Sequence, residues 1–228
     1  MIRNTIKMSD ENVNNNLKKI SERGIIICIE GLDCSGKTTQ IQKIYNLFND
    51  NNKKIIIYKY PNRETEIGKI IDKYLKNEIT MTKESINLLF TANRWEFNDI
   101  IEENIKNGVN VILDRYVYSG LAYFDADNRF RAEWYFNQNK GLLKPDLTIY
   151  LDADPSILQK RKGYGYEKFE NIQKQIRVYD NFKTYMKYQS PPWEVIDATL
   201  SIEEINKNIM YIIDNSIIKY KNSDIYYL

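Results

Sequence analysis

The sequence predicts an α/β domain in which five parallel strands form a sheet between two layers of helices. Short apolar runs rich in β-branched residues alternate along the chain with segments whose apolar residues recur at helical spacing. This alternation favours parallel strands joined by helical crossovers. The length of 228 residues suits one such domain, and neither an internal repeat nor a Pro/Gly-rich linker divides it. We therefore expect a single domain over residues 24–215.

The expected elements follow in order along the chain. Residues 25–30 form a continuous apolar run, which is typical of a strand buried on both faces. Pro61 ends the second strand, and Gly108 caps a long helix before the third. That helix carries one apolar stripe made of Ile86, Leu89, Phe90, Phe97, Ile100, Ile101 and Ile105. The further strands are predicted at 54–60, 109–113, 147–151 and 194–196, and the helices at 38–48, 67–75, 83–106, 155–161, 169–187 and 202–213.

The two ends of the chain do not share this pattern. Residues 1–23 are rich in Asn and Lys and poor in apolar residues, which favours a disordered N-terminal extension. Residues 216–228 are similar in composition, and we expect a C-terminal tail there. Ile217, Ile218, Tyr226 and Tyr227 could nevertheless pack against the domain.

The composition excludes several classes of function. The formal net charge of +2 gives no electrostatic reason for a nucleic-acid or membrane partner. No stretch is long and apolar enough to span a bilayer, and the N-terminus does not resemble a secretory signal. Cys28 and Cys34 form neither a disulfide framework nor a CxxC pair, which fits a reducing compartment, and we expect a cytoplasmic protein.

The chain contains no histidine. Ser-His-Asp triads, histidine general bases and histidine-rich metal sites are therefore excluded. Phosphoryl transfer does not need a histidine, because it depends mainly on positioning and charge neutralisation.

One motif predicts a phosphate cradle. Residues 31–38 read GLDCSGKT and match the pattern G-x-x-x-x-G-K-[ST] between a predicted strand and a predicted helix. The glycines let backbone N–H groups surround a phosphate, and the helix N-terminus adds partial positive charge. Lys37 would reach the β and γ oxygens of a nucleotide, and the Thr38 hydroxyl could bind Mg²⁺. The alternative is an ordinary Gly-rich turn, which the strand and helix on either side disfavour. The motif thus predicts a P-loop NTPase fold.

Three arginines lie where this fold would direct them at the P-loop. Arg63 follows the second strand, Arg115 follows the third, and Arg94 lies on the long helix. Arginine matches phosphate oxygens bidentately, so one cradle with several converging arginines implies two phosphorylated ligands. For any single arginine a surface salt bridge is an equally good explanation. Phe90 shares a helix face with Arg94, so a base could stack on Phe90 while Arg94 hydrogen-bonds its edge.

These residues and their neighbours resemble the thymidylate kinases (dTMP kinases) of eukaryotes and some large DNA viruses. The similarity covers nearly all of 24–215. It rests on motifs in matching order: EGLD at 30–33, PNR at 61–63, LLFTANRWE at 88–96, DRY at 114–116 with SG at 119–120 and AY at 122–123, KPD at 144–146, and YG at 164–165 with EKFE at 167–170.

The resemblance implies a nucleoside monophosphate kinase-like fold and transfer of the γ-phosphoryl group of ATP to dTMP, with Mg²⁺. Phe90 would stack on thymine and Arg94 would hydrogen-bond the base edge. Arg63 and Arg115 would hold the monophosphate. The other implied acceptor contacts are Asp33 at the 3′-hydroxyl, Tyr123 at the 2′ position, and Tyr60, Ser119 and Phe169 around the pocket.

On the donor side, the resemblance implies a lid over residues 162–168 that closes on the phosphates. Asp114 would join Thr38 in orienting Mg²⁺ or its waters. Family members are usually homodimers that pair through long helices. The candidate nucleotide-binding residues are Gly31, Ser35, Gly36, Lys37, Thr38, Thr39 and Arg161, of which Arg161 would pack on adenine. The candidate catalytic residues are Asp33, Lys37, Arg115 and Lys162.

Three residues depart from the family pattern. Cys34 stands where the family usually has a basic residue that reaches the γ-phosphate. A thiol cannot supply that charge, and we hypothesise that Lys162 or Arg161 supplies it from the lid. Tyr60 replaces a usual Phe, and Tyr166 replaces a usual acidic or polar residue.

Two alternatives stay open at this point. A deoxynucleoside kinase or another nucleoside monophosphate kinase would share the fold, although the former needs fewer phosphate-binding arginines than Arg63 and Arg115 provide. A nucleotide-binding protein without catalysis is supported only by Cys34. The acceptor range beyond dTMP, to dUMP or dGMP, also stays open.

Overall fold

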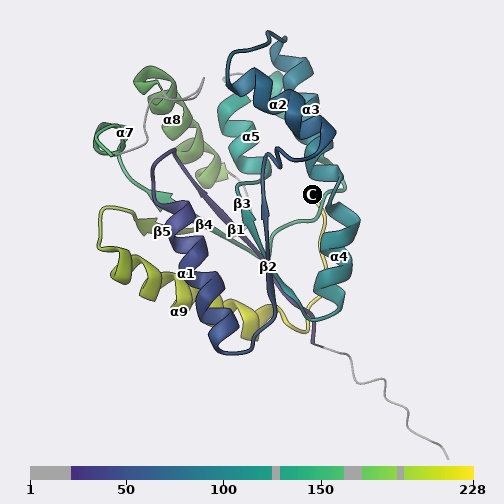
Figure 1. Cartoon of the computed structure of the whole chain (residues 1–228), viewed down its shortest axis with the longest axis vertical. Coiled ribbons are helices and arrows are strands. Elements are labelled where there is room, and N and C mark those ends of the chain that lie inside the picture. Colours follow the sequence, from purple (N-terminus) through teal and green to yellow (C-terminus); the bar gives the residue numbers. More distant parts are fainter. Residues whose placement is uncertain (1–21, 125–128, 162–170, 189–192) are drawn as a thin grey trace, which may run out of the picture.

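Five parallel strands form one sheet, as the sequence predicts (Figure 1). The structure is a computed structural model that describes residues 22–124, 129–161, 171–188 and 193–228. The strand order is β2-β3-β1-β4-β5, which places β1 at the centre between β3 and β4. The strands are β1 (Ile26–Gly31), β2 (Ile55–Lys59), β3 (Asn110–Asp114), β4 (Leu147–Asp152) and β5 (Trp193–Asp197).

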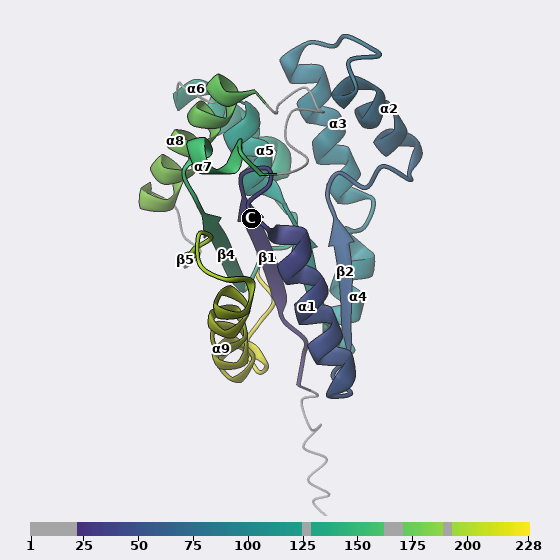
Figure 2. The same cartoon turned by 60° about the vertical axis from the view of Figure 1, so that its left-hand side comes forward.

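Helices cover both faces of the sheet and extend beyond its carboxyl edge. The helices are α1 (Lys37–Asp50), α2 (Glu66–Leu75), α3 (Lys83–Trp95), α4 (Asn98–Lys106), α5 (Val117–Phe124), α6 (Arg129–Asn139), α7 (Pro155–Leu158), α8 (Ile172–Tyr188) and α9 (Ile202–Tyr220). In Figure 2, α1 and α9 lie along the sheet, whereas α2 and α3 lie past the tips of the strand arrows. The carboxyl ends of the strands therefore face α2, α3 and α5. Among the described residues, no helix is long and apolar enough to cross a membrane.

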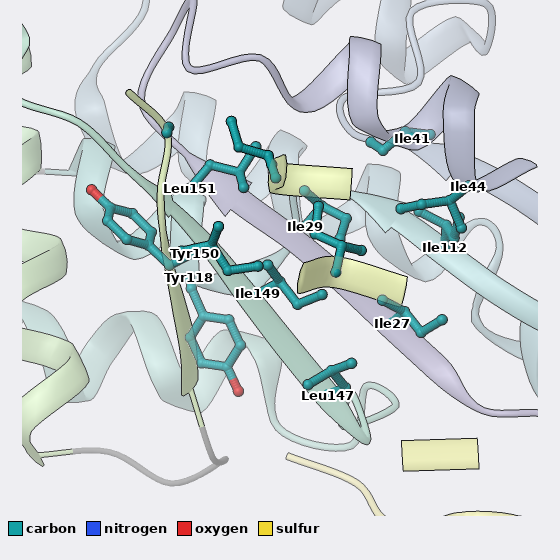
Figure 3. Packing of buried hydrophobic residues seen from close by; sticks show 14 of the residues in the cluster. Ile27, Ile29, Ile41, Ile44, Ile112, Tyr118, Leu147, Ile149, Tyr150 and Leu151 are labelled. Carbon is teal, nitrogen blue, oxygen red and sulfur yellow. The ribbon is translucent and has the colours of Figure 1, made fainter. Parts of the chain in front are cut away.

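Alternation along β1 divides the core into two layers. Ile27 and Ile29 pack with Ile41 and Ile44 of α1, as Figure 3 shows. Ile26 and Cys28, which alternate with them along the strand, belong to the cluster that contains Ile101 and Ile105 of α4. A strand that is apolar on both faces is what a central parallel strand requires, since helices cover it on each side.

The segment at 83–106 is two helices, so the single long helix predicted there is wrong. α3 ends at Trp95, and Phe97 leaves the helical path with φ −117° and ψ −3°. The Phe97 ring packs 5.5 Å from that of Tyr58, and the buried Asn98 accepts a hydrogen bond of 2.9 Å from the Leu143 amide. These contacts turn α4 onto the sheet. The stripe is divided as a result, and Ile100 is half exposed.

Residues 216–228, where the sequence predicts a C-terminal tail, contact the rest of the chain. α9 continues to Tyr220, past the predicted boundary. The last residues then run beside the segment before β4, where Leu143 and Tyr227 form an antiparallel bridge and the Leu228 amide donates to Leu142 O at 2.8 Å.

The start of the domain also differs from the prediction. Arg23, which the sequence assigns to the extension, forms a buried ion pair with Asp146 at 2.6 Å. Its backbone N–H donates to the carbonyl of Lys221 at 2.9 Å. Residues 1–21 of the expected extension lie outside the described residues.

Candidate active site

The P-loop connects the end of β1 to α1, as its motif predicts. Gly31 has φ +148°, and a Cβ atom there would lie 2.7 Å from Ser35 Oγ and 2.9 Å from the Leu151 carbonyl. Only glycine fits this position, because any side chain would collide with backbone. Gly36 is also left-handed, with φ +98°, and it leads into the first turn of α1.

The side chain of Lys37 folds back onto this loop. Its ammonium donates to Leu32 O at 2.6 Å, Gly31 O at 3.2 Å and Ser35 Oγ at 3.3 Å. Burial, followed by the positive charge of Arg115, lowers the pKa of Lys37 from 10.5 to about 8. The ammonium is thus poorly solvated, and a nucleotide phosphate would provide it with a strong partner.

The other predicted donor residues lie around the same loop. Thr38 and Thr39 are exposed in the first turn of α1. Arg161 donates to Cys34 O at 3.0 Å and to Ala198 O at 2.7 Å, so it joins the P-loop to the turn after β5. The lid over residues 162–168, with the predicted catalytic Lys162, lies outside the described residues.

Arg115 connects the P-loop to the second half of the site. Its guanidinium forms an ion pair with Asp33 and donates to Gly31 O at 2.8 Å and Ser119 Oγ at 3.1 Å. Its charge also lies 5.6 Å from the centre of the Tyr123 ring. The pair is mostly buried, with 17% of the Arg115 side chain and 22% of the Asp33 side chain exposed.

Asp33 is held by several groups at once. The Tyr123 hydroxyl donates to Asp33 Oδ2 at 3.0 Å, and the Gln175 amide donates to it at 2.9 Å. Burial alone would raise the pKa of Asp33, but the charges of Arg115 and Lys37 and these hydrogen bonds hold it below its ordinary value. Asp33 is therefore an ionised acceptor that faces a neighbouring pocket.

That pocket adjoins the P-loop and has a cavity volume of about 160 Å³. All eight of the predicted acceptor residues that the structure describes line it, namely Asp33, Tyr60, Arg63, Phe90, Arg94, Arg115, Ser119 and Tyr123. The ninth, Phe169, lies outside the described residues. The wall is formed where α3 and α5 approach each other beyond the carboxyl ends of β2 and β3.

Arg94 is held rigidly at one end of the pocket. It is 3% exposed, and it donates to Asn139 Oδ1 at 2.9 Å and 3.1 Å, to the Tyr135 hydroxyl at 3.1 Å and to Thr91 Oγ1 at 3.1 Å. Phe90 lies one turn earlier on the same face of α3 and is half-buried. Arg63 lies elsewhere in the wall, where it donates to Asp72 at 2.9 Å.

Thr38 and Asp114, the predicted metal ligands, fit Mg²⁺ by their chemistry. Asp114 ends β3 opposite Ile29 of β1, so it stands beside the strand that leads into the P-loop. Hydroxyl and carboxylate oxygens suit Mg²⁺, which completes its octahedron with waters and substrate phosphates. Within the described ranges, no three Cys, Asp or Glu side chains are grouped to hold a metal ion by themselves. These two residues therefore suit an ion that arrives with a nucleotide.

Four residues that position the site were not predicted. Tyr135 and Asn139 hold Arg94 from α6, Gln175 holds Asp33 from α8, and Glu30 contacts the start of α5. α6 itself was not predicted, so Tyr135 and Asn139 had no assigned place. Asn139 lies four residues after Tyr135, and that helical spacing was the available signal. A neutral amide such as Gln175 has no comparable signal in sequence.

The sheet order, the P-loop and the arginine-lined pocket beside it define a P-loop kinase of the nucleoside monophosphate kinase fold. The family model for thymidylate kinase matches residues 29–209. The chain belongs to the thymidylate kinase family.

Relatives from distant organisms match over most of their length. The thymidylate kinase of Schizosaccharomyces pombe is 42% identical over 85% of this chain and 93% of its own. The putative thymidylate kinase of Invertebrate iridescent virus 6 is 40% identical over 85% of this chain and 90% of its own. A solved thymidylate kinase from Candida albicans, which is described as having broad substrate specificity, superposes with a TM-score of 0.80 at 34% identity, covering 90% of this chain and 98% of that one.

Proposed function

We propose that this protein transfers the γ-phosphoryl group of ATP to dTMP, forming ADP and dTDP. The observation that carries the proposal is the contact between the two halves of the site. Asp33 lies inside the P-loop, yet it pairs with Arg115 of the adjoining pocket. A nucleotide in the cradle and a monophosphate in the pocket would therefore meet at this pair. Membership of the thymidylate kinase family supports dTMP as the acceptor.

The pocket offers a distinct contact for each part of dTMP. Arg63 and Arg115 would bind the monophosphate through bidentate hydrogen bonds. Phe90 would stack on the base, and Arg94 would donate to its edge. Asp33 would accept from the 3′-hydroxyl, and Tyr123 would stand where a ribose 2′-hydroxyl needs space. All of these side chains line the same cavity beside the P-loop.

Transfer would proceed in line without a general base. A phosphate oxygen of dTMP is already anionic, so no proton has to be removed before it attacks the γ-phosphorus. Lys37 would neutralise charge on the β and γ oxygens, and Arg115 would orient the attacking phosphate. Mg²⁺, when bound with Thr38 and Asp114 nearby, would neutralise the charge that develops on the β–γ bridge. These roles agree with a chain that contains no histidine.

The charge missing at Cys34 is proposed to come from the segment that follows α7. Arg161 already reaches Cys34 O at 3.0 Å, which leaves its neighbour Lys162 as the candidate for the γ-phosphate. Loss of a charge at the transferring group costs about a hundredfold in kcat. We expect that loss for Lys162→Ala and little change for Lys160→Ala, a lysine of the same segment. An unchanged kcat in Lys162→Ala would reject this part of the proposal.

A coupled ADP-release assay tests the proposed function. Purified protein is supplied with ATP, Mg²⁺ and, in turn, dTMP, dUMP, dGMP, dCMP and thymidine. We expect strong turnover with dTMP, weak turnover with dCMP and none with thymidine. A Lys37→Ala variant controls for contaminating kinases and should be inactive with every acceptor. ATP binding without turnover of any monophosphate would reject the proposal and favour a non-catalytic nucleotide-binding protein.

We also propose that the protein forms homodimers through the outer face of α3. Leu88 and Trp95 are 44% and 41% exposed and lie seven residues apart, which places them on one side of the helix. Sedimentation velocity should show a dimer for the wild type and a monomer for Leu88→Glu. A monomeric wild type would reject this assignment without affecting the proposed reaction.

A further inference from the structure

Glu30, near the end of β1, carries a carboxylate for which the proposed reaction has no use. Its side chain is 0% exposed in the centre of the sheet. Carboxylates are almost never buried to this degree unless other groups satisfy them. Burial raises the pKa of Glu30, whereas hydrogen bonds from Ser119 and the charge of Arg115 oppose that change. The fold therefore keeps a carboxylate where its burial is unfavourable. The groups that contact Glu30 show which segment it stabilises.

The contacts of Glu30 converge on one turn, which ends β3 and begins α5. Oε1 accepts from the backbone amides of Tyr116 at 2.9 Å and Ser119 at 3.0 Å. Oε2 accepts from the Ser119 hydroxyl. The Cys28 thiol lies 3.7 Å from Oε1. The first amides of a helix have no partner within the helix, and a negative charge is favourable there. Glu30 of β1 therefore caps the N-terminus of α5, a helix that follows another strand, β3.

Arg115 depends on this turn in two ways. It has φ +65°, a conformation that a residue other than glycine keeps only when its surroundings hold it. The amide held by Glu30 belongs to the next residue, Tyr116. In addition, the Ser119 hydroxyl has one proton, which it donates to Glu30, so its lone pairs are left to accept from Arg115 Nη1 at 3.1 Å. Glu30, Ser119 and Arg115 thus form a directed chain of hydrogen bonds.

We propose that Glu30 is a positioning residue that holds Arg115 ready for the acceptor phosphate. The inference rests on the proposed function, in which Arg115 binds dTMP. Glu30 immediately precedes Gly31, so the strand that starts the donor cradle also places the acceptor arginine. Adjacent residues of β1 therefore begin the P-loop and hold the turn that carries Arg115.

Glu30→Gln tests the chain of hydrogen bonds while it preserves the shape of the side chain. A carbonyl oxygen can still accept from the two amides, but the new NH₂ group must donate toward Ser119 Oγ. Ser119 Oγ must then accept from both the NH₂ group and Arg115, and its own proton loses its acceptor, so the hydroxyl turns and its hydrogen bond to Arg115 weakens. Misplacement of a substrate-positioning group by about 1 Å can cost up to a hundredfold in rate, so we expect KM for dTMP to rise at least about tenfold and kcat to fall. KM for ATP should stay within about twofold, because the P-loop amides are unchanged.

Three further measurements separate positioning from general stability. Amide hydrogen exchange should become faster at Tyr116 and Ser119 in Glu30→Gln. Ser119→Ala should also raise KM for dTMP, and the double variant should be no worse than the worse single variant, because both act through one chain. Glu203→Gln, an exposed glutamate on α9, is the matched control and should behave as the wild type.

The outcomes are distinct. Unchanged exchange at the two amides, equal rises in KM for dTMP and ATP, or a lower melting temperature with unchanged kinetics would each overturn the inference. If the wild type does not phosphorylate dTMP, the proposed function fails. The exchange experiment then still decides whether Glu30 holds the turn, since it requires no substrate.

Discussion

Charged side chains at the carboxyl ends of β1 and β3 govern one another's proton affinity. Lys37 is buried beside Arg115, and both effects lower its pKa, while Asp33, Asp114 and Glu30 oppose them. The result is a lysine with a pKa of about 8, within the range in which the enzyme can be assayed. A nucleotide phosphate would restore the lost stabilisation of the ammonium and raise the pKa again.

The pH dependence of ATP use should reveal this lysine. As pH rises through about 8, Lys37 in the free protein loses its proton and its attraction for phosphate. We expect kcat/KM for ATP to fall above that pH, because kcat/KM reports groups of the free enzyme. kcat should fall only at higher pH, since bound phosphates favour the charged form. The measurement is a set of initial rates from pH 6.5 to 10 with saturating dTMP and Mg²⁺.

Lys37→Arg is the control, because arginine stays charged throughout this range. Its activity should be low, but the fall in kcat/KM near pH 8 should be gone. If the fall remained in Lys37→Arg, another group would be responsible.

At the scale of residues, the sequence predicts the side chains that would contact a phosphate. It misses the side chains that hold these in position by hydrogen bonds. Lys37 and Arg115 stand in motifs, because phosphate binding needs those residue types at those positions. Asn139 and Gln175 hold functional side chains by hydrogen bonds from helices distant in sequence. Their positions depend on how α6 and α8 pack, which no local pattern encodes.

At the scale of elements, the five strands could be predicted because each contains a short apolar run, whereas the crossover from β3 to β4 was predicted without its helices α5 and α6. The break between α3 and α4 could not be predicted, because Phe97 continues the helical apolar stripe. Only the contact of Phe97 with Tyr58 and that of Asn98 with Leu143 end the helix. α5 was missed because it is short and buried on nearly all sides. Tertiary contacts thus decide where a helix ends when the pattern does not.

Gly120 shows how closely α5 and α6 are packed. A Cβ atom there would lie 2.0 Å from the Tyr135 hydroxyl and 3.3 Å from Arg94 Nη1. That hydroxyl cannot move aside freely, because it donates to Val117 O at 2.7 Å and accepts from Arg94. We expect Gly120→Ala to lower the free energy of unfolding by about 2 kcal/mol, although alanine favours helices. The displaced Arg94 should also raise KM for dTMP.

Urea unfolding and steady-state kinetics check this prediction together. Asn46→Ala, on the exposed face of α1, is the control and should change stability by less than about 0.5 kcal/mol. A Gly120→Ala protein with wild-type stability and wild-type KM would show that α6 can shift at little cost.

At the scale of the whole molecule, the residues just before β1 and just after α9 meet at the edge of the sheet opposite the site. Arg23 Nη1 and Nη2 bind both oxygens of Asp146, and Arg23 also donates to Ser223 O at 2.8 Å. Asp146 Oδ2 accepts in addition from the Ile26 amide at 2.8 Å. These contacts join the starts of β1 and β4 to the residues after α9. Polar residues such as these give no sign of order in the sequence, because their partners lie 120 to 200 positions away.

A substitution at this edge should therefore lower stability without changing catalysis. Arg23→Ala leaves Asp146 buried without its cation, and breaking such a pair costs about 3–5 kcal/mol in the free energy of unfolding. Lys53→Ala removes an exposed pair with Asp214 and should cost less than about 0.5 kcal/mol. At temperatures where Arg23→Ala is folded, its KM values for ATP and dTMP should equal those of the wild type, because the P-loop lies at the other end of β1. Guanidinium unfolding and kinetics at 15 °C measure both. A change in KM, or a stability loss no larger than that of Lys53→Ala, would show that the contacts of Arg23 do not stabilise the fold independently of the active site.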